Sequence, residues 1–163
     1  MATLNKQTAC QKIISGGQTG VDRGALDACI EKKFPCGGWC PKGRLAEDGP
    51  IDLKYPLKET DSKSYDFRTI LNVEDSDATL IIVHDILSGG TLTTWIQATA
   101  RYKPLKVVHF EKFNMKNKPE EIAAWISENG IQTLNVAGPG ASDWPEGYSI
   151  AFQLISALID QFR

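Results

Sequence analysis

The sequence is poor in histidine and cysteine, lacks a long apolar run and carries no excess of basic residues. Its 163 residues include 2 histidines and 4 cysteines, and 18 Lys and Arg stand against 20 Asp and Glu, for a formal net charge of −2. A balance this even argues against the broad basic surface of a nucleic-acid-binding protein. No apolar stretch approaches the roughly 18 residues of a membrane span, and the polar segment Met1–Gln11 lacks the apolar core of a secretory signal. We therefore expect a cytoplasmic protein with neither nucleic acid nor a membrane as partner.

The few cysteines and histidines also bear on metal binding. The cysteines are Cys10, Cys29, Cys36 and Cys40. The spacing of the last two suggests a metal site, but structural zinc usually needs two such pairs or a pair plus histidines. The other two cysteines show no matching spacing, and the histidines, His84 and His109, are far away in sequence. We favour reduced, buried or half-buried thiols and expect no metal site.

Apolar β-type runs alternate with helical patterns along the chain. The expected strands are Lys12–Ser15, Cys36–Cys40, a short edge strand at Leu57–Thr60, Ala78–His84, Leu105–Phe110 and Ile131–Ala137. The expected helices are Asp22–Lys33, Ser62–Asp75, Thr91–Tyr102, Pro119–Asn129 and Tyr148–Phe162. This alternation predicts a three-layer, Rossmann-like α/β fold, doubly wound, with a mainly parallel sheet and helices on both faces. We expect a single domain over residues 1–163, with residues 1–11 loosely ordered.

Several local features sharpen these expectations. The continuous apolar run Ala78–His84 predicts a central strand covered on both faces. Asp61 or Ser62 is the expected N-cap of the second helix. The segment Pro41–Pro56 is expected to be irregular, either a mobile lid or a charged surface loop. In the third helix the expected core contacts are Leu92, Trp95, Ile96, Ala98 and Tyr102.

A glycine-rich turn, Gly16-Gly17-Gln18-Thr19-Gly20, joins the first expected strand to the first expected helix. Glycines let the backbone approach a ligand closely, and a helix N-terminus offers unpaired N–H groups and a partial positive charge. The turn matches neither the dinucleotide fingerprint nor a Walker loop. The alternative is a tight turn that needs glycine only for its backbone angles.

A second turn of this kind, Ser88-Gly89-Gly90-Thr91, follows the most apolar run in the sequence. In parallel sheets, ligands bind outside the carboxyl ends of the strands, where the strand order reverses. If the Lys12 and Ala78 strands are neighbours there, the two turns face one crevice. A third loop, which begins at Ala137-Gly138-Pro139, ends the last expected strand on the same edge.

Three basic residues are candidates for holding an anion in that crevice. Arg68 lies in the helix before the Ala78 strand, where its guanidinium either clamps a phosphate or remains solvated on the helix surface. Lys42 and Arg44 lie in the segment Pro41–Pro56, where they either cover an anion or belong to a charged surface loop.

Six segments together resemble the molybdenum-carrier (molybdenum cofactor carrier-like) family. They are ISGGQTGVDR (14–23), GWCPKGR (38–44), AEDGP (46–50), YPLKET (55–60), DSDATL (75–80) and LNVAGP (134–139). The resemblance covers nearly the whole chain. It implies a Rossmann-like fold related to the lysine-decarboxylase-like superfamily, a cytoplasmic homo-oligomer, and a phosphorylated small-molecule ligand, for which molybdenum cofactor is the first candidate.

The same superfamily includes phosphoribohydrolases, which supply a contrasting hypothesis. Those enzymes resemble this chain in an arginine, here Arg68, that precedes a Gly-Gly loop, here Gly89-Gly90. Their loop is followed by a glutamate, and here Thr93-Thr94-Trp95 stands in its place. The missing carboxylate favours a binding protein without catalytic residues over the alternative, a nucleotide-binding or nucleotide-processing enzyme.

The candidate ligand-binding residues are Gly16, Gly17, Gln18, Thr19, Gly20, Asp22, Arg23, Lys42, Arg44, Arg68, Ser88, Gly89, Gly90, Thr91 and Gly138.

Overall fold

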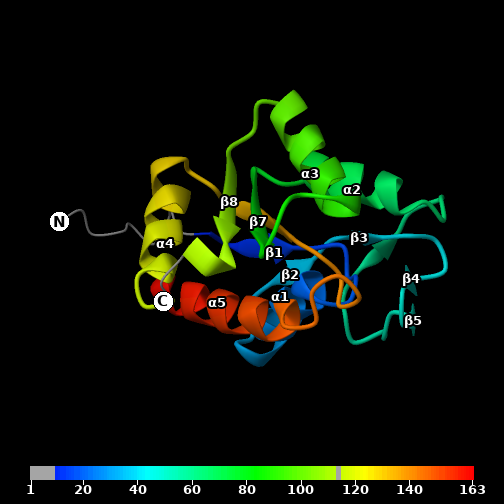
Figure 1. Cartoon of the computed structure of the whole chain (residues 1–163), viewed down its shortest axis with the longest axis horizontal. Coiled ribbons are helices and arrows are strands. Elements are labelled where there is room, and N and C mark those ends of the chain that lie inside the picture. The colour runs from blue at the N-terminus through cyan, green and yellow to red at the C-terminus, as the bar shows by residue number, and fades with distance from the viewer. Residues whose placement is uncertain (1–9, 113–114) are drawn as a thin grey trace.

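The computed structural model describes residues 10–112 and 115–163, so most of the expected loose N-terminus lies outside the described residues (Figure 1). The apolar runs form a parallel sheet of 5 strands in the spatial order β2-β1-β9-β7-β8. Its strands are β1 (Lys12–Ile14), β2 (Cys36–Gly37), β7 (Ala78–Val83), β8 (Leu105–His109) and β9 (Thr133–Ala137).

Helices cover both faces of this sheet, which confirms the predicted three-layer Rossmann-like fold (Figure 1). One face carries α1 (Val21–Glu31), α4 (Lys118–Glu128) and α5 (Gly147–Gln161). The other carries α2 (Tyr65–Glu74) and α3 (Gly89–Ala100). A short 3-10 helix, Phe110–Lys112, follows β8. None of the helices in the described ranges is long and apolar enough to cross a membrane.

Strand β9 occupies the centre of the sheet, although it comes last in the chain. It pairs with β1 on one side and with β7 on the other, so the Lys12 and Ala78 strands are not neighbours, and the condition stated for the two turns is not met. If β9 is counted as the first strand, and β1, β2, β7 and β8 as the second to the fifth, the spatial order becomes 3-2-1-4-5. This is the order of a doubly wound sheet in which the chain starts at a different strand. The reversal of strand order lies between β9 and β7, and this is where a ligand site is expected.

The core follows the predicted pattern on most elements. All six residues of β7 are buried, as expected for a central strand covered on both faces. The amphipathic stripe of α5 is buried against this core at Ala151, Leu154, Ile155, Leu158 and Ile159. A smaller apolar cluster around Leu26, Ile51 and Leu57 lies beneath the segment that connects β2 to α2.

That connecting segment departs from the expectations in several ways. The expected strand Cys36–Cys40 is split, because Gly38 has a φ of 130° and turns the chain out of the central sheet. Its second half is β3 (Trp39–Cys40), which pairs with β6 (Lys58–Glu59) in a separate two-stranded sheet. A small hairpin, β4 (Leu45–Ala46) with β5 (Gly49–Pro50), interrupts the expected irregular stretch.

Helix α2 begins later than predicted. Its N-cap is Ser64, whose hydroxyl accepts a hydrogen bond from the amide of Asp66, rather than Asp61 or Ser62. The latter two lie in the turn before the helix, where the Ser62 carbonyl accepts from the Thr60 hydroxyl.

Helix α3 presents a different face to the core from the one predicted. Leu92, Trp95 and Ile96 are 38%, 38% and 47% exposed, and Tyr102 beyond the helix is 96% exposed. Ala98 is buried as expected, together with Thr91 and Thr94. These three short side chains share one helical face, which lets the helix backbone approach the sheet and leaves the large apolar residues outside.

Candidate functional site

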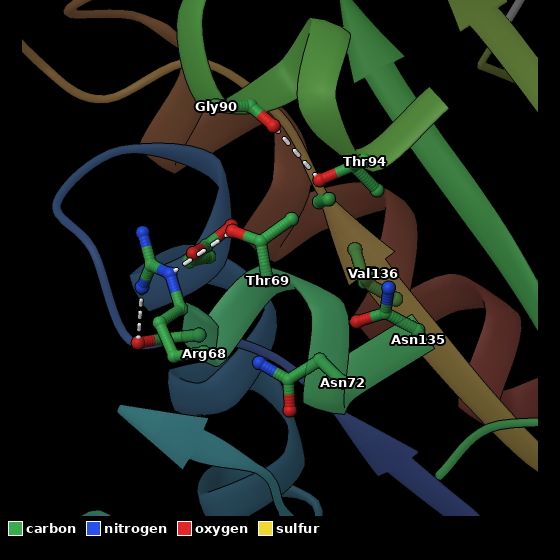
Figure 2. A pocket seen from close by; sticks show the side chains of 10 residues that line it. Arg68, Thr69, Asn72, Gly90, Thr94, Asn135 and Val136 are labelled. Carbon is green, nitrogen blue, oxygen red and sulfur yellow. Dashed lines mark hydrogen bonds between the residues drawn. The ribbon is translucent and has the colours of Figure 1, made fainter. Parts of the chain in front are cut away.

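A small cavity lies at the carboxyl ends of β1 and β9, beside the reversal of strand order. The volume open to the centre of a water molecule is about 40 Å³. This leaves room for roughly three waters or one small oxyanion. Figure 2 shows that helix α2 and the start of helix α3 face each other across it, with β9 behind. The lining residues are Gly16, Asp22, Arg68, Thr69, Asn72, Gly90, Thr94, Asn135, Val136 and Ala137.

Arg68 is the cation of this cavity. Its side chain is buried, at 7% exposure, which rules out the alternative of a solvated arginine on the helix surface. One guanidinium nitrogen, Nη1, donates to the Gly16 carbonyl at 2.7 Å, and Nε lies 3.3 Å from the Thr69 hydroxyl (Figure 2). The guanidinium carbon lies 5.3 Å from the centre of the Tyr65 ring, and the second terminal nitrogen, Nη2, forms no hydrogen bond with any described residue, so it retains donors for a ligand.

Asp22 is the carboxylate of the same cavity. It is the second residue of α1, is 6% exposed, and accepts a hydrogen bond of 3.3 Å from the Gln18 amide. Burial raises the pKa of Asp22 to about 6, although the positive charge of Arg68 and the Gln18 hydrogen bond lower it. Among the described residues that line the cavity, Asp22 and Arg68 are the only ones with ionisable side chains.

The first turn of α3 supplies hydrogen-bond donors at the rim of the cavity. The Leu92 amide is the first that bonds back, to the Ser88 carbonyl at 3.1 Å. Within the described part of the chain the amides of Gly89, Gly90 and Thr91 have no acceptor, and Gly90 lines the cavity. Unpaired amides and the helix dipole favour an anion at this position.

The loop after β1 is closed by its own contacts rather than open to a ligand. The Gln18 side-chain oxygen accepts from the amides of Thr19 (3.1 Å) and Glu47 (2.9 Å). The Thr19 hydroxyl contacts the Glu47 carboxylate and accepts from the Ala141 amide at 3.0 Å. Glu47 also accepts from the Ser142 amide and hydroxyl, and its hydrogen bonds from Thr19 and Ser142 lower the pKa of its carboxyl. The Glu47 carboxylate of the chain itself therefore takes the Thr19 hydroxyl, and the Gln18 side-chain oxygen is used within these loops.

Three other candidate cations lie away from the cavity lining. Arg23 donates to the Gly17 carbonyl at 3.0 Å and forms an ion pair of 2.8 Å with Asp48. Arg44 donates to four backbone carbonyls of its own loop, those of residues 51, 52, 55 and 57. Lys42 is exposed and is not among the residues that line the cavity.

Close packing explains most of the candidate glycines. A Cβ on Gly16 would lie 2.4 Å from Arg68 Nη1, and one on Gly138 would lie 2.4 Å from the Ile82 carbonyl. Gly20 has a φ of 82°, and a Cβ there would lie 2.5 Å from the Pro139 carbonyl. Ser88 and Gly89 are exposed at the start of α3, and Gly90 borders the cavity.

Four polar residues of the lining were not predicted. They are Thr69, Asn72, Thr94 and Asn135. Asn72 holds the Trp39 backbone through hydrogen bonds of 2.8 and 3.0 Å, and Asn135 donates to the Thr79 hydroxyl at 3.3 Å. The available signal was a polar residue inside an otherwise apolar strand, as at Asn135 between Leu134 and Val136.

Trp39 does not border this cavity. It lines a separate recess of about 270 Å³ that residues of β1 and β2 also border, where its indole donates to Asp75 at 2.6 Å. The Lys58 ammonium lies 5.6 Å from the centre of the indole ring. An intramolecular cation–π contact therefore uses this ring.

Comparisons with known proteins agree with the fold. Residues 13–159 match the model of the circularly permutated YpsA SLOG family, in keeping with the cyclically shifted strand order. A crystal structure from Syntrophus aciditrophicus SB, of a "Putative molybdenum carrier protein", is 44% identical and superposes with a TM-score of 0.90. The match covers 93% of this chain and 96% of that one. No curated protein matches the chain. The predicted resemblance is confirmed, and the chain belongs to the circularly permuted YpsA SLOG family.

Proposed function

We propose that this protein binds a phosphorylated small molecule, with the phosphate in the Arg68 cavity. The observation that carries the proposal is a buried arginine with an unpartnered Nη2 in a cavity bordered by Gly90, at the start of α3. A guanidinium and free helix amides are the donors that proteins use for phosphate oxygens. The cavity is large enough for the phosphate alone, so the remainder of the ligand would lie over its rim.

Molybdenum cofactor is the first candidate ligand, because the relative from Syntrophus aciditrophicus bears a molybdenum-carrier name. The donor set of the cavity fits the phosphate of such a pterin. Among the described residues no group of three or more His, Cys, Asp or Glu side chains could hold a metal ion. The protein would therefore hold the phosphate, while the metal, which supplies redox chemistry, would keep the ligands of the cofactor itself.

Native mass spectrometry with metal analysis, on protein purified without oxygen, tests the identity of the ligand. A bound mass that matches a phosphorylated pterin, together with molybdenum, is the expected result. A bound nucleotide instead would redirect the proposal to nucleotide binding. Calorimetry with inorganic phosphate then tests the site, because Arg68→Ala should reduce phosphate affinity at least tenfold while Lys42→Ala leaves it unchanged. Equal affinities for the two variants would contradict the assignment of the cavity.

One observation favours a second candidate function, nucleotide processing. Asp22 places a buried carboxylate beside Arg68, although the glutamate of the related hydrolases is missing from α3. A carboxylate in that position is the type of group that assists cleavage of a glycosidic bond. Release of free base from a nucleoside monophosphate, abolished in Asp22→Asn, would support this candidate. Intact substrate after prolonged incubation with excess protein would exclude that reaction.

Self-association is also part of the proposal. The resemblance implies a homo-oligomer, and α3 leaves Leu92, Trp95 and Ile96 partly exposed. Sedimentation at several concentrations measures the oligomeric state. Trp95→Lys should weaken an oligomer that uses α3, whereas an unchanged mass would place the contact elsewhere.

A further inference from the structure

The charges that surround Asp22 leave little attraction for a doubly charged anion that carries no proton. Arg68 of α2 would attract an anion in the cavity, and the ionised Asp22 would repel it. The two effects would cancel, and the low polarity of the cavity strengthens both. Arg23, which also lies on α1, forms an ion pair with the Asp48 carboxylate. The other elements around the cavity contribute only uncharged groups, among them Gly16, Thr94 and Asn135.

A proton shared between the Asp22 carboxyl group and a ligand oxygen would replace the repulsion between them with a hydrogen bond. A protonated Asp22 would leave Arg68 uncompensated and would add an O–H donor next to a bound oxyanion. Its proton is available near neutral pH, because burial raises the pKa of Asp22 to about 6. The Gln18 amide already bonds one carboxyl oxygen at 3.3 Å, and Asp22 is one of the residues that line the cavity.

We propose that Asp22 links oxyanion binding to one proton, which is held between its carboxyl group and an oxygen of the bound ligand. This inference rests on the proposed function, because it requires an oxyanion in the Arg68 cavity. It makes Asp22 a residue that determines specificity. Inorganic phosphate, as HPO₄²⁻, brings its own proton and donates it in a hydrogen bond to the ionised carboxylate, so it binds without protonation of Asp22. A fully deprotonated oxyanion, such as sulfate, molybdate or a phosphate monoester dianion, binds only when Asp22 is protonated.

Calorimetry with sulfate and inorganic phosphate, from pH 7.0 to pH 8.5, tests this proposal on the unmodified protein. With a pKa of about 6 for Asp22, sulfate affinity should fall about 30-fold over this range, whereas phosphate affinity should rise about threefold, because the fraction of phosphate present as HPO₄²⁻ grows. Repeating the titrations in buffers of different ionisation enthalpy gives the number of protons taken up on binding. Sulfate should take up about one proton per site at pH 8, and phosphate about none. Parallel pH profiles for the two anions, without proton uptake, would overturn the inference.

Asp22→Asn is the matching variant, because asparagine keeps the size of the side chain and its oxygen still accepts from the Gln18 amide. In this variant sulfate affinity should become independent of pH and exceed that of the unmodified protein at pH 8.5. Asp61→Asn removes the same formal charge from an exposed side chain and should preserve the original pH profile. A pH-dependent sulfate affinity in Asp22→Asn would overturn the assignment to Asp22.

The two proposals fail in different ways. If neither anion binds the unmodified protein at any pH, the cavity is not an oxyanion site, and both proposals are overturned. If both anions bind and Arg68→Ala abolishes the binding, but the pH profiles are parallel, the proposed function stands and only the role of Asp22 is lost.

Discussion

The loop before α1 and the turn before α3 have the same glycine-rich character in sequence, but the protein uses them in opposite ways. In the first, a Cβ on Gly16, Gly17 or Gly20 would lie within 2.5 Å of another atom. In the second, a Cβ on Gly89 or Gly90 would meet nothing within 4 Å. The first loop is therefore packed against α2, the connecting segment around Ile51 and Leu57, and the loop after β9, whereas the second is an open rim. In the loop before α1, glycine permits other atoms to approach the backbone closely. In the turn before α3, glycine leaves space beside the backbone.

The largest effect is expected in the packed loop. Gly20→Ala places a methyl group against the Pro139 carbonyl, in a backbone conformation with a φ of 82° that alanine avoids. We expect a loss of about 4 kcal/mol in the free energy of unfolding, from the clash and the backbone strain together. Urea denaturation measures it. A loss below about 1 kcal/mol would show that this loop is as open as the turn before α3.

The next effect depends on pH and on the buried carboxyl beside the packed loop. Folding raises the pKa of Asp22 from about 3.9 to about 6, so its contribution to stability is complete below pH 4 and is lost as pH rises through 6. Without ligand, Asp22→Asn should be more stable than the unmodified protein at pH 8 by about 3 kcal/mol, and equal to it at pH 4. Urea titrations at both pH values give the difference. An equal difference at the two pH values would contradict the buried carboxyl.

A smaller effect is expected for Arg44, whose guanidinium ties the Pro41–Pro56 segment together. Arg44→Ala removes its four hydrogen bonds, three to carbonyls of that segment and one to the Leu57 carbonyl just beyond it, and water replaces them in part. We expect a loss of about 2 kcal/mol. Lys42→Ala, two residues away and exposed, should change stability by less than about 0.5 kcal/mol. Similar losses for the two variants would argue that the segment is not held by Arg44.

The smallest effect on stability is expected at the open rim. Gly90→Ala meets no atom and lies in the first turn of a helix, so stability should stay within about 0.5 kcal/mol of the original value. Thermal unfolding measures this change, and calorimetry with phosphate shows whether the open space is used. Reduced phosphate affinity at unchanged stability would indicate that a ligand occupies this space, whereas a large loss of stability would refute the contrast between the two loops.

The sequence correctly predicted the helices and strands that are determined by their own local pattern of apolar residues. The apolar run of β7 and the amphipathic stripe of α5 carry their own periodicity, so both were placed to within one or two residues. The exposed face of α3 was wrong, because its apolar residues mark one face and its short residues another. Which of these two faces contacts the sheet depends on how closely the helix packs against it. The periodicity of the sequence carries no information on that distance.

The site was less predictable, because it is assembled by contacts between distant residues. Gly16, Asp22, Arg68 and Gly90 were candidates, and the structure brings these four together. Arg23 and Arg44 had equally good side chains, but carboxylate and carbonyl partners from the connecting segment bind them. Nothing in the local sequence distinguishes a guanidinium that bonds its own loop from one that borders a cavity.

The central position of β9 has a consequence for how the protein is made. Strands β1 and β7 leave the ribosome well before β9, and until β9 arrives the two strand edges that it will join have no partner. Unpaired edges invite pairing between chains, and late parallel pairing between distant segments is slow. The nascent chain therefore has its greatest need of chaperones just before β9 is added. Since Asn135, Val136 and Ala137 form one wall of the cavity, ligand binding can begin only after that step.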